Sequence, residues 1–330
     1  MQTMQAVWLE NQVLSMHQNA PIPVPVEGEA LVQVNLAGIC ATDLEMVRGY
    51  YPFTGIPGHE FVGQVVQAPG NASWIGQRVV GEINLTCGEC RQCRAGRASH
   101  CEQRNTLGIR GCNGVFAEFL NIPCRNLHRV PASVTDEAAV FTEPLAAALE
   151  IQQQIHIHPE DRVLLVGAGR LGQLIAQSLA LTGCNLSVVV RHALHQQLLA
   201  QRGIKTLIEE HVELKLWDIV VEATGSDSGF NLARQAVRPR GTIILKSTFA
   251  GNSEINLSSL VVDEIQLIGS RCGPFAPALR LLQHKHVQPE PLITARYPLS
   301  DALAAFKHAN QPGVLKIILD VGATAGIKAS

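Results

Sequence analysis

Four cysteines stand within fifteen residues of the chain, at Cys87, Cys90, Cys93 and Cys101. Four thiolates on one compact loop are the ligand set of a closed, tetrahedral zinc site with a structural role. An iron–sulfur cluster also takes four cysteines, and a loop of reduced cysteines without metal is the plainest alternative. The spacing favours zinc. Because all four positions would be filled, it predicts a site that supports the fold and does no chemistry.

A second set of possible metal ligands is spread over the sequence, at Cys40, His59, Glu60 and Glu143. Taken singly, each has an ordinary structural explanation, since a lone cysteine is most often a small buried hydrophobe and a lone histidine a satisfied polar residue. Together they offer one thiolate, one imidazole and two carboxylates. Such a set suits an open, catalytic zinc, with water or substrate at the remaining position.

A glycine-rich loop, Gly167-Ala168-Gly169-Arg170-Leu171-Gly172, directly follows the apolar run 162–166 and opens a helical pattern. In this context Gly167 allows a tight turn, Gly169 leaves room for a pyrophosphate, and Gly172 lets the helix pack closely on the strand. The helix N-terminus supplies amide donors and partial positive charge. A glycine-rich turn of another α/β fold is the alternative, but the pattern predicts a dinucleotide-binding loop.

The end of the next apolar run, 186–190, should indicate which dinucleotide binds. An acidic residue there would bind the ribose 2′-hydroxyl of NAD. The chain instead has Arg191 and His192, with no acid until Glu209. A guanidinium at this point suits a 2′-phosphate, so the sequence favours NADP. The alternative is that Arg191 is a solvated loop residue and NAD is held by other contacts.

The 330 residues suggest two domains. The first 130 residues read as β-rich, with apolar, β-branched runs such as 30–36 and 61–67 between glycines and prolines. After Asp136 the pattern alternates between strand and helix, which predicts an α/β fold with a doubly wound parallel sheet. The expected strands are 162–166, 186–190, 217–222, 242–245 and 265–268, and the expected helices are 137–154, 174–181, 194–201 and 230–237. The last 35 residues, with the strand-like run 315–319, no longer fit this alternation and are expected to return to the first domain.

Composition excludes several classes of protein. Apolar residues make up 46% of the chain and charged residues 16%, and the net charge is −2. This balance predicts no nucleic-acid partner and no anionic membrane surface. No apolar stretch approaches the ~20 residues of a membrane helix, and the start lacks the pattern of a secretory signal. We therefore expect a cytoplasmic protein, whose nine cysteines, an odd number, do not form a disulfide framework.

Several motifs occur together in the order and spacing of a known family. The chain resembles the medium-chain, zinc-dependent alcohol dehydrogenases over nearly its whole length, and their threonine, polyol and sugar dehydrogenase branch in particular. Besides the four cysteines and the glycine loop, the matching residues are Cys40-Ala41-Thr42-Asp43, Gly58-His59-Glu60-Phe61-Val62-Gly63, Gly114-Val115-Phe116-Ala117-Glu118-Phe119 and Glu143-Pro144-Leu145. The resemblance implies a GroES-like catalytic domain over 1–145 and 294–330, with the structural zinc lobe at 84–104, and a Rossmann domain over 146–293.

The resemblance also implies roles at the catalytic zinc. Cys40 and His59 would be direct ligands, and Glu60 a ligand that exchanges with substrate or water. Glu143 stands where the simple alcohol branch has a cysteine, and would approach the metal directly or through water. Zinc would bind the substrate oxygen as a Lewis acid, and the substrate carbon would exchange hydride with a nicotinamide ring.

A proton must also leave the site. Thr42 matches the hydroxyl that passes this proton toward the cofactor ribose, and Asp43 matches a carboxylate that orients the zinc histidine. The chain departs from the animal alcohol dehydrogenases five residues after the zinc cysteine, where it has Glu45 in place of a histidine. Either Glu45 or bulk water would then take the proton.

Further positions are expected to line the cofactor and the substrate. Thr224 ends a strand of the parallel sheet, and Lys316 and Arg271 resemble basic residues near the cofactor phosphates, although each could equally lie on the surface. Loop positions alone suggest that the substrate pocket includes Asn84, Arg110 and Tyr51.

The sequence thus predicts an oxidoreductase with two zinc ions per chain and NADP or NAD. It would act on a secondary alcohol, namely a polyol, sugar or amino alcohol, as a homodimer or homotetramer. The alternatives are a metal-free quinone or enoyl reductase on the same fold, and a catalytically silent dinucleotide-binding scaffold. Zinc content separates them, since the enzyme would hold two ions and either alternative one.

Overall fold

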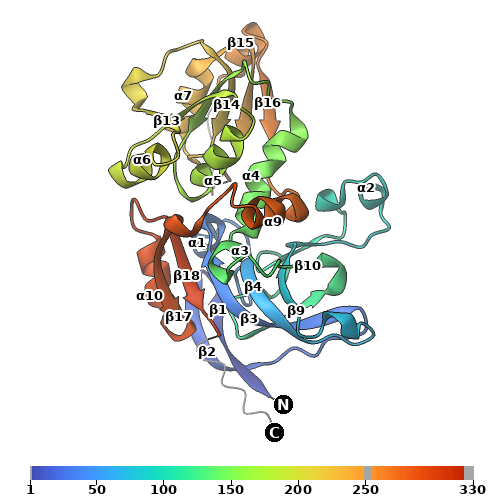
Figure 1. Ribbon diagram of the computed structural model, residues 1–330. Coiled ribbons are helices and arrows are strands. Elements are labelled where there is room, and N and C mark those ends of the chain that lie inside the picture. The colour runs from blue at the N-terminus through green and yellow to red at the C-terminus, as the bar shows by residue number, and fades with distance from the viewer. Residues whose placement is uncertain (1, 249–254, 323–330) are drawn as a thin grey trace. The chain divides into compact units, whose positions relative to one another are not determined.

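The computed structural model describes residues 2–248 and 255–322 (Figure 1). The chain forms two compact units. The first comprises Met1–Glu143, Phe275–Gln283 and Ile293–Ser330, and the second comprises Pro144–Pro274 and His284–Leu292. Among the described residues, no helix is both long and apolar enough to cross a membrane.

The first unit is built on a seven-stranded sheet with the order β10-β5-β4-β3-β18-β17, in which β9 also pairs with β3. The strands are β3 (Glu29–Ile39), β4 (Glu60–Gln67), β5 (Arg78–Gly81), β9 (Phe119–Pro123), β10 (Leu127–Arg129), β17 (Ile293–Pro298) and β18 (Lys316–Asp320). Gly38 on β3 lies opposite Glu60, and Ile39 lies opposite Ile317. The end of β3 therefore meets the beginnings of β4 and β18, which is where the candidate site lies.

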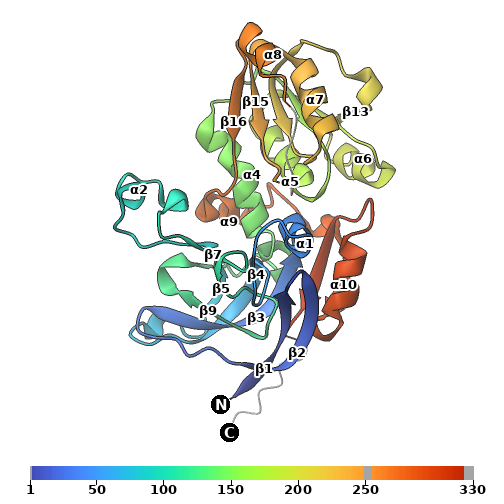
Figure 2. The same ribbon diagram turned by 180° about the vertical axis from the view of Figure 1, so that it is seen from behind.

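Smaller elements complete this unit, seen from the other side in Figure 2. They are the hairpin β1 (Thr3–Glu10) and β2 (Val13–Pro21), the small sheet β6 (Asn84–Leu85), β7 (Asn105–Leu107) and β8 (Gly111–Cys112), and the helices α1 (Ala41–Val47), α2 (Arg91–Arg94), α3 (Asp136–Ala139), α9 (Phe275–Gln283) and α10 (Ala302–Ala309). Helix α9 lies within the range that the sequence assigned to the second domain. It groups with the first unit because its apolar face packs there, and the Phe275 ring stacks on that of His128 at 5.5 Å between centroids.

The second unit holds a six-stranded, all-parallel sheet with the order β13-β12-β11-β14-β15-β16. Its strands are β11 (Arg162–Val166), β12 (Asn185–Val189), β13 (Lys205–Leu207), β14 (Trp217–Glu222), β15 (Val237–Leu245) and β16 (Gln266–Gly269). Its helices are α5 (Arg170–Ala180), α6 (Ala193–Ala200), α7 (Asp227–Ala236), α8 (Leu257–Val262) and α4 (Thr142–Gln154), whose first two residues belong to the first unit. This is the doubly wound arrangement, so the predicted fold class is confirmed.

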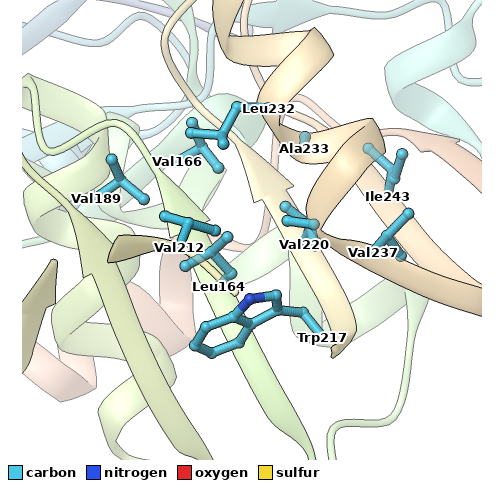
Figure 3. Close-up of a cluster of buried hydrophobic side chains, with 11 residues drawn as sticks. Leu164, Val166, Val189, Val212, Trp217, Val220, Leu232, Ala233, Val237 and Ile243 are labelled. Atoms are coloured by element: carbon cyan, nitrogen blue, oxygen red, sulfur yellow. The ribbon is translucent and has the colours of Figure 1, made fainter. Parts of the chain in front are cut away.

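Apolar side chains from these strands and from α7 form a core cluster in the second unit (Figure 3). Leu164, Val220 and Ile243 lie on three adjacent strands, and Leu232 on α7 packs against them. Burial of each large apolar side chain contributes about 1.5–3 kcal/mol. This packing explains why runs buried on both faces were recognisable in the sequence.

Candidate metal centre and nucleotide loop

Three of the four expected ligands of the catalytic zinc come together. One ligand atom from each of Cys40, His59 and Glu60 lies within 4.8 Å of the others. Cys40 follows β3 and caps α1, while His59 directly precedes β4, so the pairing of β3 with β4 brings them together. Gly58, directly before His59, turns the main chain with φ of +97°, and a Cβ there would lie 2.7 Å from the Phe116 ring. The position therefore needs glycine.

Asp43 stands behind this group. Its Oδ1 lies 3.3 Å from Nδ1 of His59, and its Oδ2 accepts a 2.8 Å hydrogen bond from the backbone N–H of Cys40. Burial opposes the charged form of His59, but the charge and hydrogen bond of Asp43, with Cys40, raise the pKa of His59 well above its usual value. Because Asp43 faces Nδ1, the arrangement leaves Nε2 of His59 for a metal.

Glu60 is fully buried, and its two carboxylate oxygens have different surroundings. Its Oε2 accepts a hydrogen bond from Nζ of Lys316, whose side chain is also buried. Its Oε1 has no hydrogen-bond partner among the described residues. A buried carboxylate oxygen without a partner is costly unless something binds it. The donor set of sulfur, imidazole and carboxylate, with this oxygen left over, fits a zinc ion.

Lys316 has a neighbour that its sequence prediction did not include. Its ammonium lies against Glu60, 3.4 Å from the carbonyl oxygen of Ile39 and 5.6 Å from the centroid of the Phe141 ring. The pairing of β18 with β3 places it there. A contact with cofactor phosphates stays a prediction.

Glu143 lies in the first turn of α4. Within the described part of the chain, the ligand group around Cys40 does not include it. Its role as a metal ligand therefore also stays a prediction.

The expected proton-transfer residues lie on α1. Thr42 Oγ1 is 3.8 Å from Sγ of Cys40, beside the ligand group. The carboxylate of Glu45 accepts a hydrogen bond from Arg48, which also donates to Asn310 Oδ1 at 2.5 Å. Glu45 is thus paired with the guanidinium of Arg48.

The three residues suggested for a substrate pocket lie on separate elements. Asn84 is on β6 and Arg110 is in the turn between β7 and β8, so both belong to the small sheet of the cysteine lobe. Tyr51 follows α1. Their part in a pocket stays a prediction.

The four cysteines of the lobe also converge, with their sulfur atoms within 4.8 Å of one another. The Sγ atoms of Cys87 and Cys101 are 3.5 Å apart, and those of Cys90 and Cys101 are 3.9 Å apart. A tetrahedron with zinc–sulfur bonds of ~2.3 Å has edges of about 3.8 Å, so the cluster fits zinc. Backbone N–H groups of Cys93 and Glu102 lower the pKa of Cys90 to about 6, which favours the thiolate that a metal needs, whereas burial raises the pKa of Cys93 to about 12. All nine cysteines, each among the described residues, have free thiols.

The glycine loop joins β11 to α5 in the second unit. Gly167 has φ of +106°, and a Cβ there would lie 2.9 Å from the methyl group of Thr224. A Cβ at Gly172 would lie 2.1 Å from the carbonyl oxygen of Gly167, whereas one at Gly169 would meet no described atom within 4 Å. Gly169 is also the N-cap of α5 and has no side chain to cap it, so the first amides, including those of Arg170 and Leu171, are available to a phosphate.

Residues around the nucleotide loop have partners of their own. Arg191 is exposed and pairs with Glu209 at 3.2 Å, and His192 is the N-cap of α6. Thr224 donates from its backbone N–H and its hydroxyl to the carboxylate of Glu222, which is buried. Sequence reasoning missed the buried Lys246 and gave no role to Glu222, although a charged residue at or directly after the end of an apolar strand was the available signal.

Comparison with known proteins agrees with this geometry. Residues 26–132 match the model of the alcohol dehydrogenase GroES-like domain, and residues 171–284 match that of zinc-binding dehydrogenases. The chain is 30% identical over 328 residues to the L-threonine 3-dehydrogenase of Coxiella burnetii, covering 91% of this chain and 94% of the relative. It is 28% identical over 327 residues to the sorbitol dehydrogenase of Halalkalibacterium halodurans, covering 92% and 94%.

Solved structures show the same fold with bound nucleotides. A zinc-binding dehydrogenase of Sinorhizobium meliloti bound to NADP has a TM-score of 0.89 and 26% identity, covering 97% of this chain and all of the other. An alcohol dehydrogenase of Escherichia coli solved with NADH has a TM-score of 0.88 and 25% identity, covering 96% and 99%. With both family models matched and a relative of 30% identity along nine-tenths of its length, the chain belongs to the zinc-dependent, medium-chain alcohol dehydrogenase family, as its motifs predicted.

Proposed function

We propose that this protein transfers hydride between a secondary alcohol and a nicotinamide cofactor at a zinc ion held by Cys40, His59 and Glu60. The observation that carries the proposal is the convergence of these three ligands, with one buried carboxylate oxygen left without a partner. A polyol, sugar or amino alcohol is the proposed substrate class, because the relatives include a sorbitol and a threonine dehydrogenase.

Each residue has a distinct task in this proposal. Bound zinc supplies a Lewis acid that makes a substrate hydroxyl easier to deprotonate. Cys40 and His59 hold the ion, and Asp43 keeps the imidazole oriented. Thr42, beside Cys40, accepts the substrate proton at Oγ1 and passes its own onward. Glu45 or bulk water receives the proton.

The two carboxylates give the site its adaptability. Lys316 fixes one oxygen of Glu60 and leaves the other for the ion or for the water that the substrate replaces. We place Glu143 as the further ligand, direct or through water. A carboxylate at this position makes the site harder than a second cysteine would, which favours oxygen-rich substrates.

For the nucleotide, we propose NADP(H) as the preferred cofactor, bound at Gly167, Gly169 and Gly172. Arg191 and His192 would meet the 2′-phosphate, and the arginine would exchange its exposed pairing with Glu209 for a stronger, bidentate one. Thr224, Arg271 and Lys316 stay proposed cofactor contacts.

A panel of alcohols and polyols with NADP⁺ and NAD⁺, followed by the absorbance of the reduced nicotinamide, tests the reaction. We expect turnover of at least one polyol, sugar or amino alcohol, with NADP⁺ preferred. Much better use of NAD⁺ would contradict the cofactor assignment. Zinc content of one ion per chain without turnover would favour the silent scaffold, and turnover of quinones or enoyl substrates at one ion would favour the metal-free reductase.

We further propose a homo-oligomer, either a dimer or a tetramer, whose subunits associate through β16 and α8. Among the described strands, β16 is an edge strand that pairs with β15 alone. Beside it, Leu257, Val261 and Val262 are 67%, 76% and 79% exposed, and Leu267 on β16 itself is 40% exposed. An apolar sheet edge of this kind favours pairing with a second copy of the same strand.

We also propose that the protein is cytoplasmic, because free thiols are typical of a reducing compartment.

A further inference from the structure

Lys246 directly follows β15 and is one of the few buried charged residues of the second unit, with 6% of its surface exposed. Its Nζ donates to the carbonyl oxygen of Ala147 at 2.7 Å, to Oγ of Ser270 at 3.1 Å and to the carbonyl oxygen of Arg271 at 3.0 Å. These acceptors belong to α4 and to the segment after β16. One ammonium thus joins three segments that are far apart in the sequence.

The three acceptors match the three N–H donors of the ammonium. A buried ammonium is tolerated only when such bonds replace water. Because the donors of Lys246 already have acceptors in the protein, its ammonium stabilises the contact between these segments. The arrangement points to a role in positioning and not to direct contact with a ligand.

The segment held by Lys246 has little freedom. Ser270 is buried, and its backbone N–H donates to the carbonyl oxygen of Leu245 at 2.9 Å. Three residues further on, a Cβ at Gly273 would lie 1.9 Å from the carbonyl oxygen of Ala146, so this segment runs directly against α4. Lys246 therefore fixes the main chain at Arg271 between β15 and α4, while the Arg271 side chain stays exposed.

This segment lies where the second half of a dinucleotide binds. The strand order reverses between β11 and β14, and dinucleotides bind across the carboxyl ends of the strands at such a reversal. The glycine loop and Arg191 follow β11 and β12, in one mononucleotide-binding half of the sheet. Lys246 and Ser270 follow β15 and β16, in the other half. If the phosphates of the dinucleotide bind at the glycine loop, its nicotinamide end lies over the half of the sheet that contains Lys246.

We propose that Lys246 is a positioning residue for the nicotinamide end of the cofactor site, acting by fixing the main chain at Ser270 and Arg271. The inference rests on the proposed function only in that the bound nucleotide is a nicotinamide dinucleotide. It makes Lys246 dispensable for the adenine end, which the glycine loop holds.

The test compares Lys246→Met with the wild-type protein by calorimetry, using NADPH and 2′-phospho-ADP-ribose, which lacks the nicotinamide. We expect Lys246→Met to bind NADPH about 10-fold more weakly or worse, because NADPH must then order the main chain at Ser270 and Arg271 as it binds, and to bind 2′-phospho-ADP-ribose within about twofold of wild type. Lys205→Met, at an exposed lysine of the same unit, is the matched control and should change neither.

A second variant keeps the test decisive if Lys246→Met does not fold. Ser270→Ala removes one of the three acceptors and should weaken NADPH binding by about threefold, again without affecting 2′-phospho-ADP-ribose. In turnover assays, both variants should raise KM for the nucleotide more than they lower kcat.

Unchanged NADPH binding by folded Lys246→Met would overturn the inference, as would equal losses for NADPH and 2′-phospho-ADP-ribose, which would mean a general structural role. The proposed function fails differently, when the wild-type protein binds NADPH but oxidises no alcohol. In that case the binding comparison still decides the role of Lys246.

Discussion

At the scale of single residues, the candidate metal centre is a set of buried charges that stabilise one another only as a group. Glu60, Asp43 and His59 have almost no exposed surface, and Lys316 is equally buried. Removing one partner of a buried ion pair leaves the other charge uncompensated, which costs more than the pair contributes. The variants that follow separate the charge balance of the site from its chemistry.

In the protein freed of its catalytic zinc, Lys316→Met should lower the free energy of unfolding by about 3–5 kcal/mol, because it leaves the Glu60 carboxylate buried without a cation. The double variant Lys316→Met with Glu60→Gln should recover most of this loss, since the amide carries no charge. Denaturant unfolding of both proteins measures the difference. A double variant less stable than the single one would show that Lys316 does not act through Glu60.

Glu143→Ala should lower kcat at least about 10-fold and leave the melting temperature nearly unchanged, because the residue is proposed as a further metal ligand in a site whose other ligands remain. Steady-state rates and zinc content of the purified variant give the comparison. Wild-type rates in Glu143→Ala would remove Glu143 from the mechanism.

At the scale of elements, the residues that do chemistry lie at the ends of strands and at the starts of helices. Cys40 begins α1 and the glycine loop begins α5, so backbone geometry sets both. The sequence predicted these positions because their motifs are local, and it predicted the parallel strands because buried runs are continuously apolar. It did not predict β13, which has only three residues, none of them fully buried.

The partner of Glu60 could not be read from the sequence for a physical reason. Lys316 is 256 positions away from Glu60 and reaches it only because β18 adds to the sheet beside β3. In the same way, Lys246 meets its acceptors through the packing of α4 and the segment after β16. Local motifs specify ligand types, whereas the charges around them depend on contacts between distant strands.

Gly169→Ala and Gly172→Ala should impair different properties, the first nucleotide binding and the second stability. A methyl group at Gly172 would clash with the carbonyl oxygen of Gly167, so this variant should lose about 1–3 kcal/mol of stability. A methyl group at Gly169 meets open space, so that variant should keep its stability within about 0.5 kcal/mol but bind NADPH more weakly, since the methyl occupies the place of the pyrophosphate. Thermal unfolding and nucleotide titration of each variant separate the two effects. Equal behaviour of the two would contradict this reading of the loop.

At the scale of the whole molecule, the candidate metal sites and the nucleotide loop belong to different units. The unit that contains β3 and β18 carries the candidate metal centre and the cysteine lobe, and the unit with the parallel sheet carries the nucleotide loop. The family match spans both. The chain therefore has the parts for both halves of a hydride transfer, and the interface proposed between subunits uses an apolar sheet edge separate from them.

Leu267→Lys should shift the protein toward the monomer, because a charge on the edge strand β16 opposes pairing with a second copy. Leu194→Lys, at a residue that is 51% exposed on α6 beside the opposite edge strand β13, is the matched control and should leave the assembly unchanged. Light scattering coupled to gel filtration gives the masses. Persistence of the wild-type oligomer in Leu267→Lys would place the interface elsewhere.

The most direct test of a zinc centre at Cys40, His59 and Glu60 is the rate of NADP⁺ reduction by a polyol, measured while a chelator removes zinc from the intact protein. We predict that the rate falls to zero as the zinc content falls from two ions per chain to one, with the ion of the four-cysteine lobe retained, and that added zinc restores it. A rate that stays constant while that ion leaves would contradict the proposed chemistry.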